Sequence, residues 1–203
     1  MRATKERKLM SLGYQYICGV DEVGRGAYAG PIVAGAVILD FNKRGFFNKI
    51  NDSKLLTAQK REDLALLIAD NALSWSISSI TNFEIDQFGL GEANRKVLEQ
   101  ACSNLKLAPN YILSDYMVGV KYPEPYELIK SGDKKIISIA AASILAKVFR
   151  DRMMRAFARK YPAYCFDRHK GYGTALHEDL LRKFGPSPIH RLSYRKFREK
   201  GLI

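Results

Sequence analysis

The pattern of apolar and polar residues first indicates a strand, a glycine-rich turn and a second strand. Residues 14–21 form one apolar run, residues 24–31 contain three glycines and a proline, and residues 32–39 form another apolar run. Short apolar runs bounded by glycine and proline are typical of buried strands. Because the turn between them is short, we expect these two strands to pair in an antiparallel hairpin.

Beyond residue 50, helical and strand patterns alternate. The spacing of apolar residues predicts helices over 58–72, 91–105, 138–160 and 177–184 and strands over 73–78 and 111–114. Thr57 and Asn82 are suitable N-caps for the first helix and for a short helical turn. Loops are expected around Pro123 and Pro125 and over 161–178. The alternation predicts an α/β fold in a single domain spanning 1–203, with a basic helical C-terminal extension from about residue 161.

Composition excludes several classes of protein. The 203 residues are 47% hydrophobic, enough for a core, and no apolar run approaches the ~18 residues that indicate a transmembrane helix. The first ten residues are charged and lack the apolar segment of a signal peptide. The three cysteines, Cys18, Cys102 and Cys165, are far apart and form no CxxC pair. We therefore expect reduced thiols, mostly in the core, and a cytoplasmic location.

The net charge of +12 is concentrated in two stretches. Residues 147–160 contain six basic residues and one acid, and residues 182–203 contain seven basic residues and one acid. Such clusters are typical of proteins that bind a polyanion, and nucleic acid is the expected partner. Solubility alone is the simpler interpretation, and binding to a membrane surface is less well supported because no segment is both amphipathic and free-standing.

Acidic residues stand at the ends of two predicted strands. Asp21 and Asp115 each follow an apolar run, Glu22 is adjacent to the first, and Asp133 comes soon after the second. Converging carboxylates bind hard cations such as Mg²⁺ or Mn²⁺, although a single strand-end aspartate more often caps a turn. Adjacent strand residues point to opposite faces. Asp21 and Glu22 can therefore share a metal only if the strand bends or one offers its backbone carbonyl.

Two glycine-containing segments suggest contacts with a ligand. Gly24-Arg25-Gly26 can bring backbone N–H groups and a guanidinium up to an anion. Its match to the dinucleotide fingerprint GxGxxA is rejected because a strand, not a helix, follows. In the segment HKGYGT over 169–174, a tyrosine on a glycine-flanked turn suits stacking on a base or sugar, or anchors the loop as a buried aromatic. The histidines lack zinc-ligand spacing, so hydrogen-bonding roles are expected.

Several motifs together resemble bacterial ribonuclease HII over nearly the whole chain. They are GVDEVGRG (19–26), AGP (29–31), DSK (52–54), LSD (113–115), GD (132–133), IAAASILAKVFRDR (139–152), HKGYGT (169–174) and HRLSY (190–194). Their order and spacing match those of that family. The first and sixth motifs are specific enough together that chance is not a serious explanation.

The resemblance implies a fold, an activity and a metal site. The fold would be ribonuclease H-like, with a mixed β-sheet and flanking helices. The activity would be endonucleolytic cleavage of the RNA strand of RNA/DNA hybrids, and cleavage on the 5′ side of a single ribonucleotide in duplex DNA, leaving 5′-phosphate and 3′-OH ends. The family's metal ligands and catalytic acids fall on Asp21, Glu22, Asp115 and Asp133, which would hold Mn²⁺ or Mg²⁺, with two ions present during catalysis.

The resemblance also implies how substrate is recognised. The family's reader of the ribose 2′-OH falls on Gly24, Arg25 and Gly26, and the tyrosine that packs on the neighbouring deoxyribose falls on Tyr172. Further substrate contacts are expected from Lys54, Lys147, His169 and Lys170. The chain departs from the family in having Ala27-Tyr28 in place of Pro-Leu, and Tyr116 in place of a glycine after the third acid.

Two other functions share part of this pattern. A metal-dependent DNA nuclease of the same fold, as in integrases or junction resolvases, would need the acids but not the GRG element. A non-catalytic duplex-binding module would explain the charge but not four acids in a basic protein. With twenty residues before Asp21, we do not expect the extra N-terminal domain of the sister ribonuclease HIII. We expect a monomer that binds RNA/DNA hybrids and ribonucleotide-containing duplex DNA, and no membrane.

Overall fold

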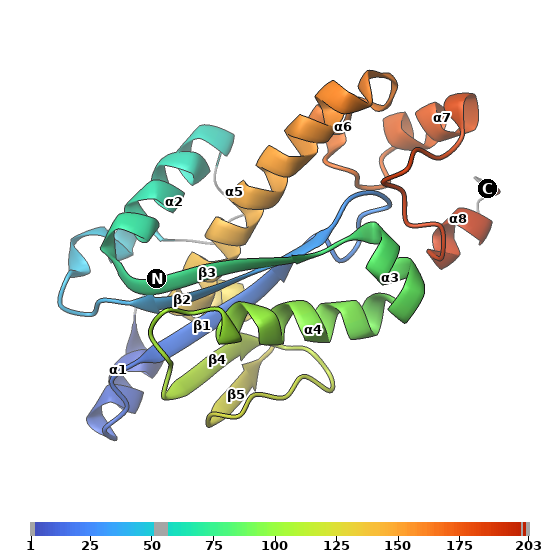
Figure 1. Ribbon diagram of the computed structural model, residues 1–203. Coiled ribbons are helices and arrows are strands. Elements are labelled where there is room, and N and C mark those ends of the chain that lie inside the picture. The colour runs from blue at the N-terminus through green and yellow to red at the C-terminus, as the bar shows by residue number, and fades with distance from the viewer. Residues whose placement is uncertain (1–2, 51–56, 200, 202–203) are drawn as a thin grey trace.

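A five-stranded mixed sheet lies at the centre of the computed structural model, which describes residues 3–50, 57–199 and 201 (Figure 1). The strand order is β3-β2-β1-β4-β5. The strands are β1 (Ile17–Val23), β2 (Ile32–Leu39), β3 (Ala72–Ile80), β4 (Tyr111–Asp115) and β5 (Tyr126–Ile129). The first three pair antiparallel, whereas β4 pairs parallel with both β1 and β5. The predicted hairpin and the α/β class are confirmed.

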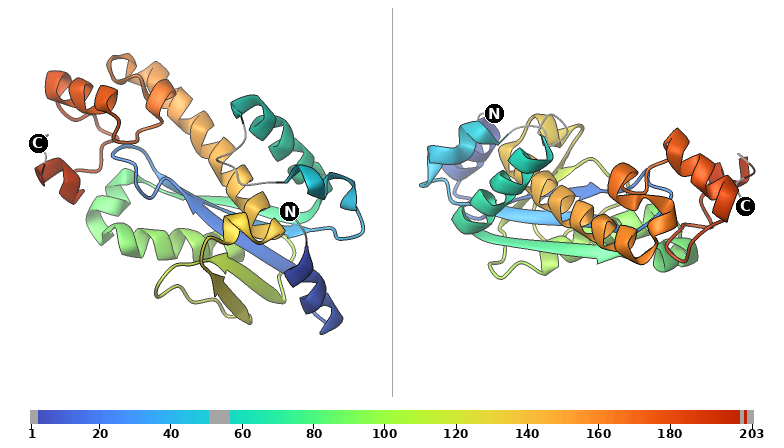
Figure 2. Two further views of the ribbon diagram at one scale, coloured as in Figure 1. Left: turned by 180° about the vertical axis from the view of Figure 1, so that it is seen from behind. Right: turned by 90° about the horizontal axis from the view of Figure 1, so that it is seen from above.

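Helices cover both faces of the sheet. They are α1 (Thr4–Ser11), α2 (Ala58–Asn71), α3 (Asn82–Phe88), α4 (Leu90–Ser103), α5 (Ile137–Lys160), α6 (Phe166–His169), α7 (Ala175–Phe184) and α8 (Arg195–Glu199), with 3₁₀ turns η1 (Arg44–Lys49), η3 (Gly132–Lys134) and η4 (Pro162–Tyr164). From behind, α5 crosses one face with α2 beside it, and α4 lies against the other face (Figure 2). None of the helices among the described residues has the length and apolar character needed to cross a membrane.

The strand β2 is apolar throughout because both of its faces are covered. Val37 and Leu39 pack in the cluster beneath α2 and α5, whereas Ile38 packs in the cluster beneath α4. A strand buried on both faces reads as a continuous apolar run. The central hairpin is therefore the part of the sheet that the sequence pattern predicts most directly.

Glycines let α5 approach the sheet closely. A Cβ atom on Gly19 would lie 2.1 Å from the backbone carbon of Ser138, and one on Gly35 would lie 2.6 Å from the carbonyl oxygen of Ala142. The first half of α5 is correspondingly small and apolar, as predicted from the sequence. This close packing fixes the position of α5 relative to the carboxyl end of β1.

Several predicted boundaries were wrong. Strand β1 begins and ends later than the predicted 14–21, and its last residue directly precedes the glycine turn. Asn82 is the first helical residue, and Thr81 is the N-cap, with its hydroxyl accepting from the Glu84 N–H. Thr57 caps α2 as predicted, accepting from the Lys60 N–H. Strand β5 was missed because it is a short edge strand next to two prolines. The predicted 161–178 loop contains η4, α6 and the start of α7.

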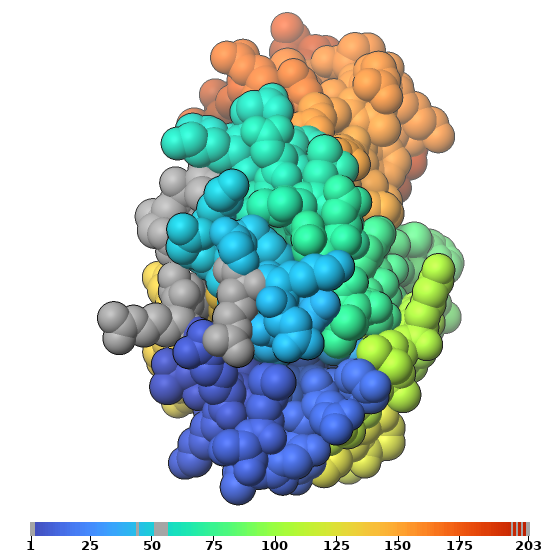
Figure 3. Space-filling model, turned by 90° about the vertical axis from the view of Figure 1, so that its left-hand side faces the viewer, coloured from blue at the N-terminus to red at the C-terminus, as the bar shows by residue number. Residues whose placement is uncertain are grey.

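The C-terminal elements form their own apolar cluster around the end of α5. Tyr164, Phe166, Leu181 and Phe197 pack there with Tyr28, which comes from the turn after β1. In a side view, the orange and red surface of these elements stands beyond the teal surface of α2 and away from the blue N-terminal segment (Figure 3). The C-terminal elements therefore pack against the turn after β1 and hold it beside the carboxyl ends of β1 and β4.

Candidate active site

Three carboxylates meet where β1 and β4 separate. The pairing of these strands ends at Val20 and Ser114, so that Asp21 and Asp115 follow directly on neighbouring strands. Carboxylate oxygens of Asp21, Glu22 and Asp115 all lie within 4.8 Å of one another. The Glu22 N–H donates to Asp21 Oδ1 at 2.8 Å. The alternation of adjacent strand residues thus does not keep the first two acids apart.

Asp133 approaches the same place from η3. The Gly132 N–H donates to Asp115 Oδ1 at 2.7 Å, which ties η3 to the end of β4. Asp133 is buried, and its charge acts on Asp21. The preceding residue, Ser131, has φ of 55°, a left-handed conformation that turns the chain back toward the sheet. All four predicted acids therefore line one cavity.

Crowding and burial shift the protonation of two of these acids. Burial, followed by the neighbouring charge of Glu22, raises the pKa of Asp21 well above its usual value, and a hydrogen bond from Ser143 only partly offsets this. Burial also raises the pKa of Glu22, against a hydrogen bond from Asn94. Both shifts arise because the charged forms lose water without gaining a full counter-charge from the protein.

The residues present fit a divalent cation. Glu22 Oε2 is buried, and it has no hydrogen-bond partner among the residues that the structure describes. A buried carboxylate oxygen without a partner costs free energy unless a cation binds it. Several convergent carboxylate oxygens are the ligand set that Mg²⁺ and Mn²⁺ prefer. Asp21, Glu22 and Asp115, with Asp133 beside them, are the residues that would hold such ions.

The predicted substrate-reading segments line the same cavity, which has a volume of about 570 Å³. Its lining residues are Asp21, Glu22, Val23, Gly24, Arg25, Gly26, Asp115, Ser131, Asp133, Lys134, Ser143, Lys147 and Tyr172. The backbone of Tyr172 forms an antiparallel bridge with Ala27, directly after the GRG segment. The structure therefore brings together the acids, the GRG segment, Lys147 and Tyr172.

Two other predicted substrate contacts, His169 and Lys170, lie outside the cavity lining. His169 is 7% exposed, its Nε2 lies 2.8 Å from the Tyr164 carbonyl oxygen, and its Nδ1 accepts from the Gly171 N–H. It supports the loop from within and does not line the cavity, so the expectation of a direct substrate contact is corrected. Lys170 also lies outside the cavity lining, with its ammonium bonded to the Asp167 carbonyl. Lys54 lies outside the described residues.

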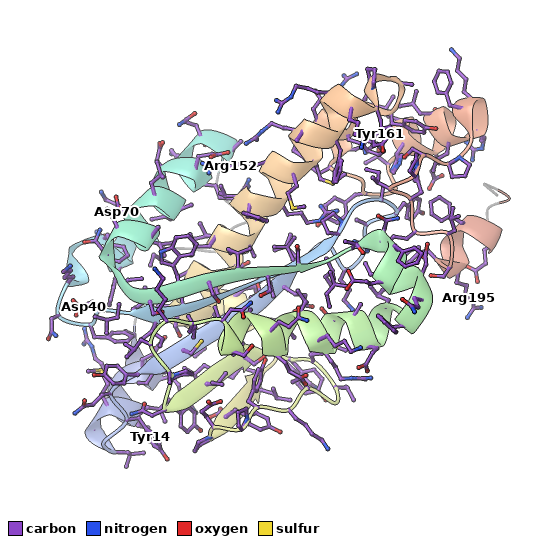
Figure 4. The ribbon with its side chains drawn as sticks, in the orientation of Figure 1. Tyr14, Asp40, Asp70, Arg152, Tyr161 and Arg195 are labelled. Atoms are coloured by element: carbon purple, nitrogen blue, oxygen red, sulfur yellow. The ribbon has the colours of Figure 1, made fainter. Side chains whose placement is uncertain are left out.

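The basic half of α5 is less free than its sequence suggests. Arg150 is fully buried, and the guanidinium of Arg191 in the second basic stretch is buried as well. Arg152 and Arg155 both form ion pairs with Glu62 on α2. Arg152 lies between the two helices (Figure 4). The basic residues of these stretches are therefore not equally accessible to a duplex: Arg150 and Arg191 are buried, whereas Arg152 and Arg155 have side chains that are 54% and 40% exposed while they join α5 to α2.

Sequence reasoning missed several side chains that support the site. Ser143 and Asn94 hydrogen-bond the two acids of β1. The sequence does offer a signal for Ser143, because Ser138, Ser143 and Lys147 are the only polar residues in the otherwise apolar first half of α5. Asn94 left none, since α4 shows only an ordinary amphipathic pattern. The two residues that depart from the family pattern lie outside the cavity lining. Tyr28 is buried, with its hydroxyl 3.2 Å from Glu178 Oε1, and Tyr116 is exposed, with the Lys130 ammonium over its ring.

Comparison with known proteins agrees with this geometry. The sequence profile of the family "Ribonuclease HII" matches residues 18–197. The chain is 49% identical to a ribonuclease HII of Acholeplasma laidlawii, over 93% of this chain and 92% of that protein. Among solved structures, ribonuclease H2 from Pyrococcus horikoshii OT3 superposes with a TM-score of 0.77 at 28% identity, covering 91% of this chain and 96% of that one.

A more distant structure shares the fold. Bst-RNase HIII in complex with Mn²⁺ gives a TM-score of 0.71 at 18% identity, over 94% of this chain and 70% of that one. At that identity the likeness concerns the fold alone, and it confirms the predicted ribonuclease H-like architecture together with the five-stranded mixed sheet. The profile match spans most of the chain, and the acids and glycines of the cavity fall within it. The chain therefore belongs to the ribonuclease HII family.

Proposed function

We propose that this protein cleaves the RNA strand of RNA/DNA hybrids and also cuts on the 5′ side of a single ribonucleotide in duplex DNA, with two divalent metal ions. As a member of the ribonuclease HII family it is a hydrolytic nuclease that acts on RNA/DNA hybrids. The observation that carries the finer proposal is the shared cavity. Metal-binding acids and the GRG segment line one space, so that cleavage and recognition of a ribose occur side by side.

The acids would act by holding metal and substrate in line. When bound, the divalent ions supply an activated water and neutralise charge on the leaving 3′ oxygen. Asp21, Glu22 and Asp115 would hold and orient those ions from two strand ends, and Asp133 would add a carboxylate from η3. Ser143 keeps Asp21 oriented by its hydrogen bond. Positioning and charge neutralisation, rather than covalent chemistry by the protein, would then supply most of the acceleration.

Recognition of RNA would depend on the backbone of the GRG segment. The 2′-OH is both donor and acceptor, and it is the group that distinguishes RNA from DNA at one nucleotide. A Cβ atom on Gly26 would meet nothing within 4 Å, so this glycine leaves open space at the cavity for a close approach. Tyr172 would then contact the neighbouring sugar, while Lys147 neutralises a phosphate.

The proposal extends to partners and setting. A family whose members act on nucleic acid, together with the net charge of +12, supports binding of hybrid and ribonucleotide-containing duplexes. We include in the proposal a monomeric, cytoplasmic enzyme that uses Mn²⁺ or Mg²⁺ and contributes to the removal of ribonucleotides from DNA. The solved ribonuclease HIII complex contains Mn²⁺, which supports a metal of this kind here.

Cleavage of three labelled duplexes tests the function. One is all DNA, one contains a single ribonucleotide and one is an RNA/DNA hybrid, each assayed with Mg²⁺, with Mn²⁺ and with EDTA. We expect metal-dependent cutting of the hybrid and cutting 5′ to the lone ribonucleotide, with the all-DNA duplex intact. Cutting of plain DNA would favour the resolvase-like alternative, and binding without cutting would favour a duplex-binding module.

Replacing Tyr172 tests its assigned role. Tyr172→Ala removes the ring from the cavity but leaves the acids in place, so the cleavage rate at an isolated ribonucleotide should fall about 5- to 150-fold, the effect of losing ~1–3 kcal/mol of stacking. Cleavage of a long hybrid should fall less, because the hybrid can bind productively at many positions along its length. The comparison of kcat/KM on the two substrates measures this. Equal losses on both would contradict the assignment.

A further inference from the structure

One buried guanidinium joins the two loops that line the substrate side of the cavity. Arg150 on α5 is fully buried. Its Nε donates to the Pro31 carbonyl at 2.9 Å, its Nη2 to the Ala29 carbonyl at 3.1 Å and its Nη1 to the Lys170 carbonyl at 2.9 Å. The first two carbonyls follow the GRG segment, and the third lies two residues before Tyr172. A single side chain therefore bridges segments that are well over a hundred residues apart in sequence.

The two loops also contact each other directly at this point. The N–H groups of Tyr28 and Ala29 both donate to the Gly171 carbonyl, at 2.7 and 3.2 Å. Gly171 has φ of +81°, and a Cβ atom there would lie 2.5 Å from the Ala29 carbonyl oxygen. Arg150 lies over the Tyr172 ring, with its guanidinium carbon 5.2 Å from the ring centroid. The side chain of Tyr172 and the loop after the GRG segment thus share one support.

The same guanidinium occupies the space that a side chain at Gly24 would need. A Cβ atom on this glycine would lie 2.2 Å from Arg150 Nε, and its φ is +96°. The glycine therefore accommodates the arginine as well as permitting the turn. The position of the GRG segment depends on the exact place of the Arg150 side chain.

A second buried arginine holds the other side of the loop. Arg191 is fully buried, its Nε donates to the Gly30 carbonyl at 2.9 Å, and its Nη1 donates to the Arg25 carbonyl at 3.2 Å. Neither arginine forms an ion pair with a carboxylate within the described part of the chain. Burying an unpaired charge is costly. The hydrogen bonds of each arginine to backbone carbonyl groups require the planar set of donors that arginine has and lysine lacks.

We propose that Arg150, assisted by Arg191, is a positioning residue for ribonucleotide recognition, which fixes the spacing between the Gly24–Gly26 backbone and Tyr172. The inference rests on the proposed function, in which these two elements contact adjacent sugars at an RNA–DNA junction. Neither arginine lines the cavity, so both act through the loops that they hold. A single ribonucleotide can bind productively in only one position along the duplex. The Gly24–Gly26 backbone and Tyr172 must therefore contact their two sugars at the same time. A long hybrid presents a ribose at every step and depends less on the spacing.

The test compares Arg150→Lys with a control of similar burial. Arg150→Lys retains the charge but cannot make three hydrogen bonds in one plane. Leu98 is a fully buried residue of α4 that packs against the other face of the sheet, so Leu98→Ala lowers stability without touching either loop. The readout is the ratio of kcat/KM on a single-ribonucleotide duplex to kcat/KM on a long hybrid. All proteins are assayed with Mn²⁺ at a temperature at which thermal melts show them folded.

We expect the ratio to fall at least tenfold in Arg150→Lys and to stay within twofold of the wild-type value in Leu98→Ala. The amides of Tyr28 and Ala29 should exchange with solvent at least tenfold faster in Arg150→Lys, measured without metal or substrate. Combining Arg150→Lys with Tyr172→Ala should lower the ratio no further than Tyr172→Ala alone, because both changes remove the same contact.

An unchanged ratio in Arg150→Lys, or an equal fall in Leu98→Ala, would overturn the inference. If Arg150→Lys does not fold, Arg191→Lys decides, since it loosens only the carbonyls of Arg25 and Gly30, and an unchanged ratio there would likewise refute the spacing role. A wild-type protein that does not cut at a single ribonucleotide would refute the proposed function itself. A wild type that cuts there, with variants that keep its ratio, would refute the positioning role alone.

Discussion

Asp21 illustrates how a residue that is costly to the fold can belong to the proposed metal site. It is 5% exposed on the central strand and lies among other carboxylates. Its raised pKa, like that of Glu22, has burial as its first cause. A group whose pKa is raised by folding contributes stability at low pH and loses it as the pH rises through the shifted pKa. Without metal, the protein should therefore lose stability as these acids ionise, and bound cations should restore it.

The substitution Asp21→Asn separates these effects. We expect cleavage to fall below detection with Mg²⁺ or Mn²⁺, because a metal-binding carboxylate is lost. In EDTA the variant should be more stable than the wild type by roughly 1–3 kcal/mol, the usual scale for relieving a buried, poorly compensated polar group. Thermal melts with EDTA and with Mn²⁺ measure this, alongside cleavage assays.

The matched control for this test is Asp70→Asn, which changes an exposed carboxylate on α2 (Figure 4). It should leave cleavage and the Mn²⁺-dependent rise in melting temperature unchanged. Near-normal turnover by Asp21→Asn, or an equal stabilisation of that variant and the wild type by Mn²⁺, would contradict the assignment of Asp21 as a metal ligand.

At the scale of elements, α5 determines the geometry of the site. Its small first half packs on the backbone of β1 and β2, and its second half supplies the arginine that holds the loops. Gly19→Ala should destabilise the protein by about 3 kcal/mol or more, because the added methyl group meets backbone atoms of α5 that cannot move aside. Urea unfolding measures the change in the free energy of unfolding.

A glycine in an open position provides the comparison for Gly19. Gly91→Ala lies near the start of α4, where a Cβ atom would meet nothing within 4 Å and φ is not positive. Alanine there should be neutral or should stabilise by up to ~1 kcal/mol. If Gly19→Ala proved as harmless as Gly91→Ala, the close packing of α5 on β1 would be wrong.

A cluster of buried histidines couples the C-terminal elements to the Tyr172 loop. His177 Nε2 lies 3.0 Å from His190 Nε2, its Nδ1 lies 3.0 Å from the Tyr172 carbonyl oxygen, and its ring stacks on that of His169. Burial lowers the pKa of His177 to about 3 and that of His190 to about 4. The negative charge of Glu178 opposes the shift of the His177 pKa. With these pKa values the rings of His177 and His190 are neutral at pH 7.

Acid should loosen this cluster before it unfolds the sheet. A histidine whose pKa is depressed by folding contributes stability that is present above pH ~6.5 and is lost as the pH falls toward the depressed value. Each such histidine can cost up to ~1.4 kcal/mol per pH unit in this window. Near-ultraviolet circular dichroism between pH 7 and 4 should report early changes at Tyr28 and Tyr164, ahead of the loss of far-ultraviolet signal. His177→Gln should make the early change less steep, and coincident transitions in both proteins would contradict this.

The elements predicted from sequence were those with a strong local pattern. The apolar hairpin, α2, α4 and α5 follow from periodicity and caps, whereas β5 is four half-exposed residues beside prolines and carries no such pattern. The same holds at the site. The acids and glycines are identified by their motifs, but Arg150 looks in sequence like any surface arginine on a basic helix. Its burial results from how α5, the GRG turn and the C-terminal loop meet, which no local pattern records.

At the scale of the whole molecule, a strongly basic protein contains a cluster of acids. The net charge is +12, and only some of the arginines are buried or paired within the fold. Affinity for duplexes should therefore fall about 10²-fold between 50 and 200 mM salt, as expected for about four phosphate contacts. Binding by Asp21→Asn in EDTA measures this without cleavage. A salt-independent affinity would contradict an electrostatic mode of binding.

The chain winds outward from β1 in two directions. It proceeds first to β2 and β3 on one side, and later returns to add β4 and β5 on the other. The winding reverses between β1 and β4, and in open sheets a ligand crevice lies outside the carboxyl ends of strands at such a reversal. Asp21 enters with the first of these strands and Asp115 with the second, so the proposed pair of metal ligands is brought together only when β4 pairs with β1. The time course of Mn²⁺ binding during refolding should consequently report when β4 pairs with β1. A fragment ending before β4 would contain Asp21 and Glu22 but bind the ion poorly.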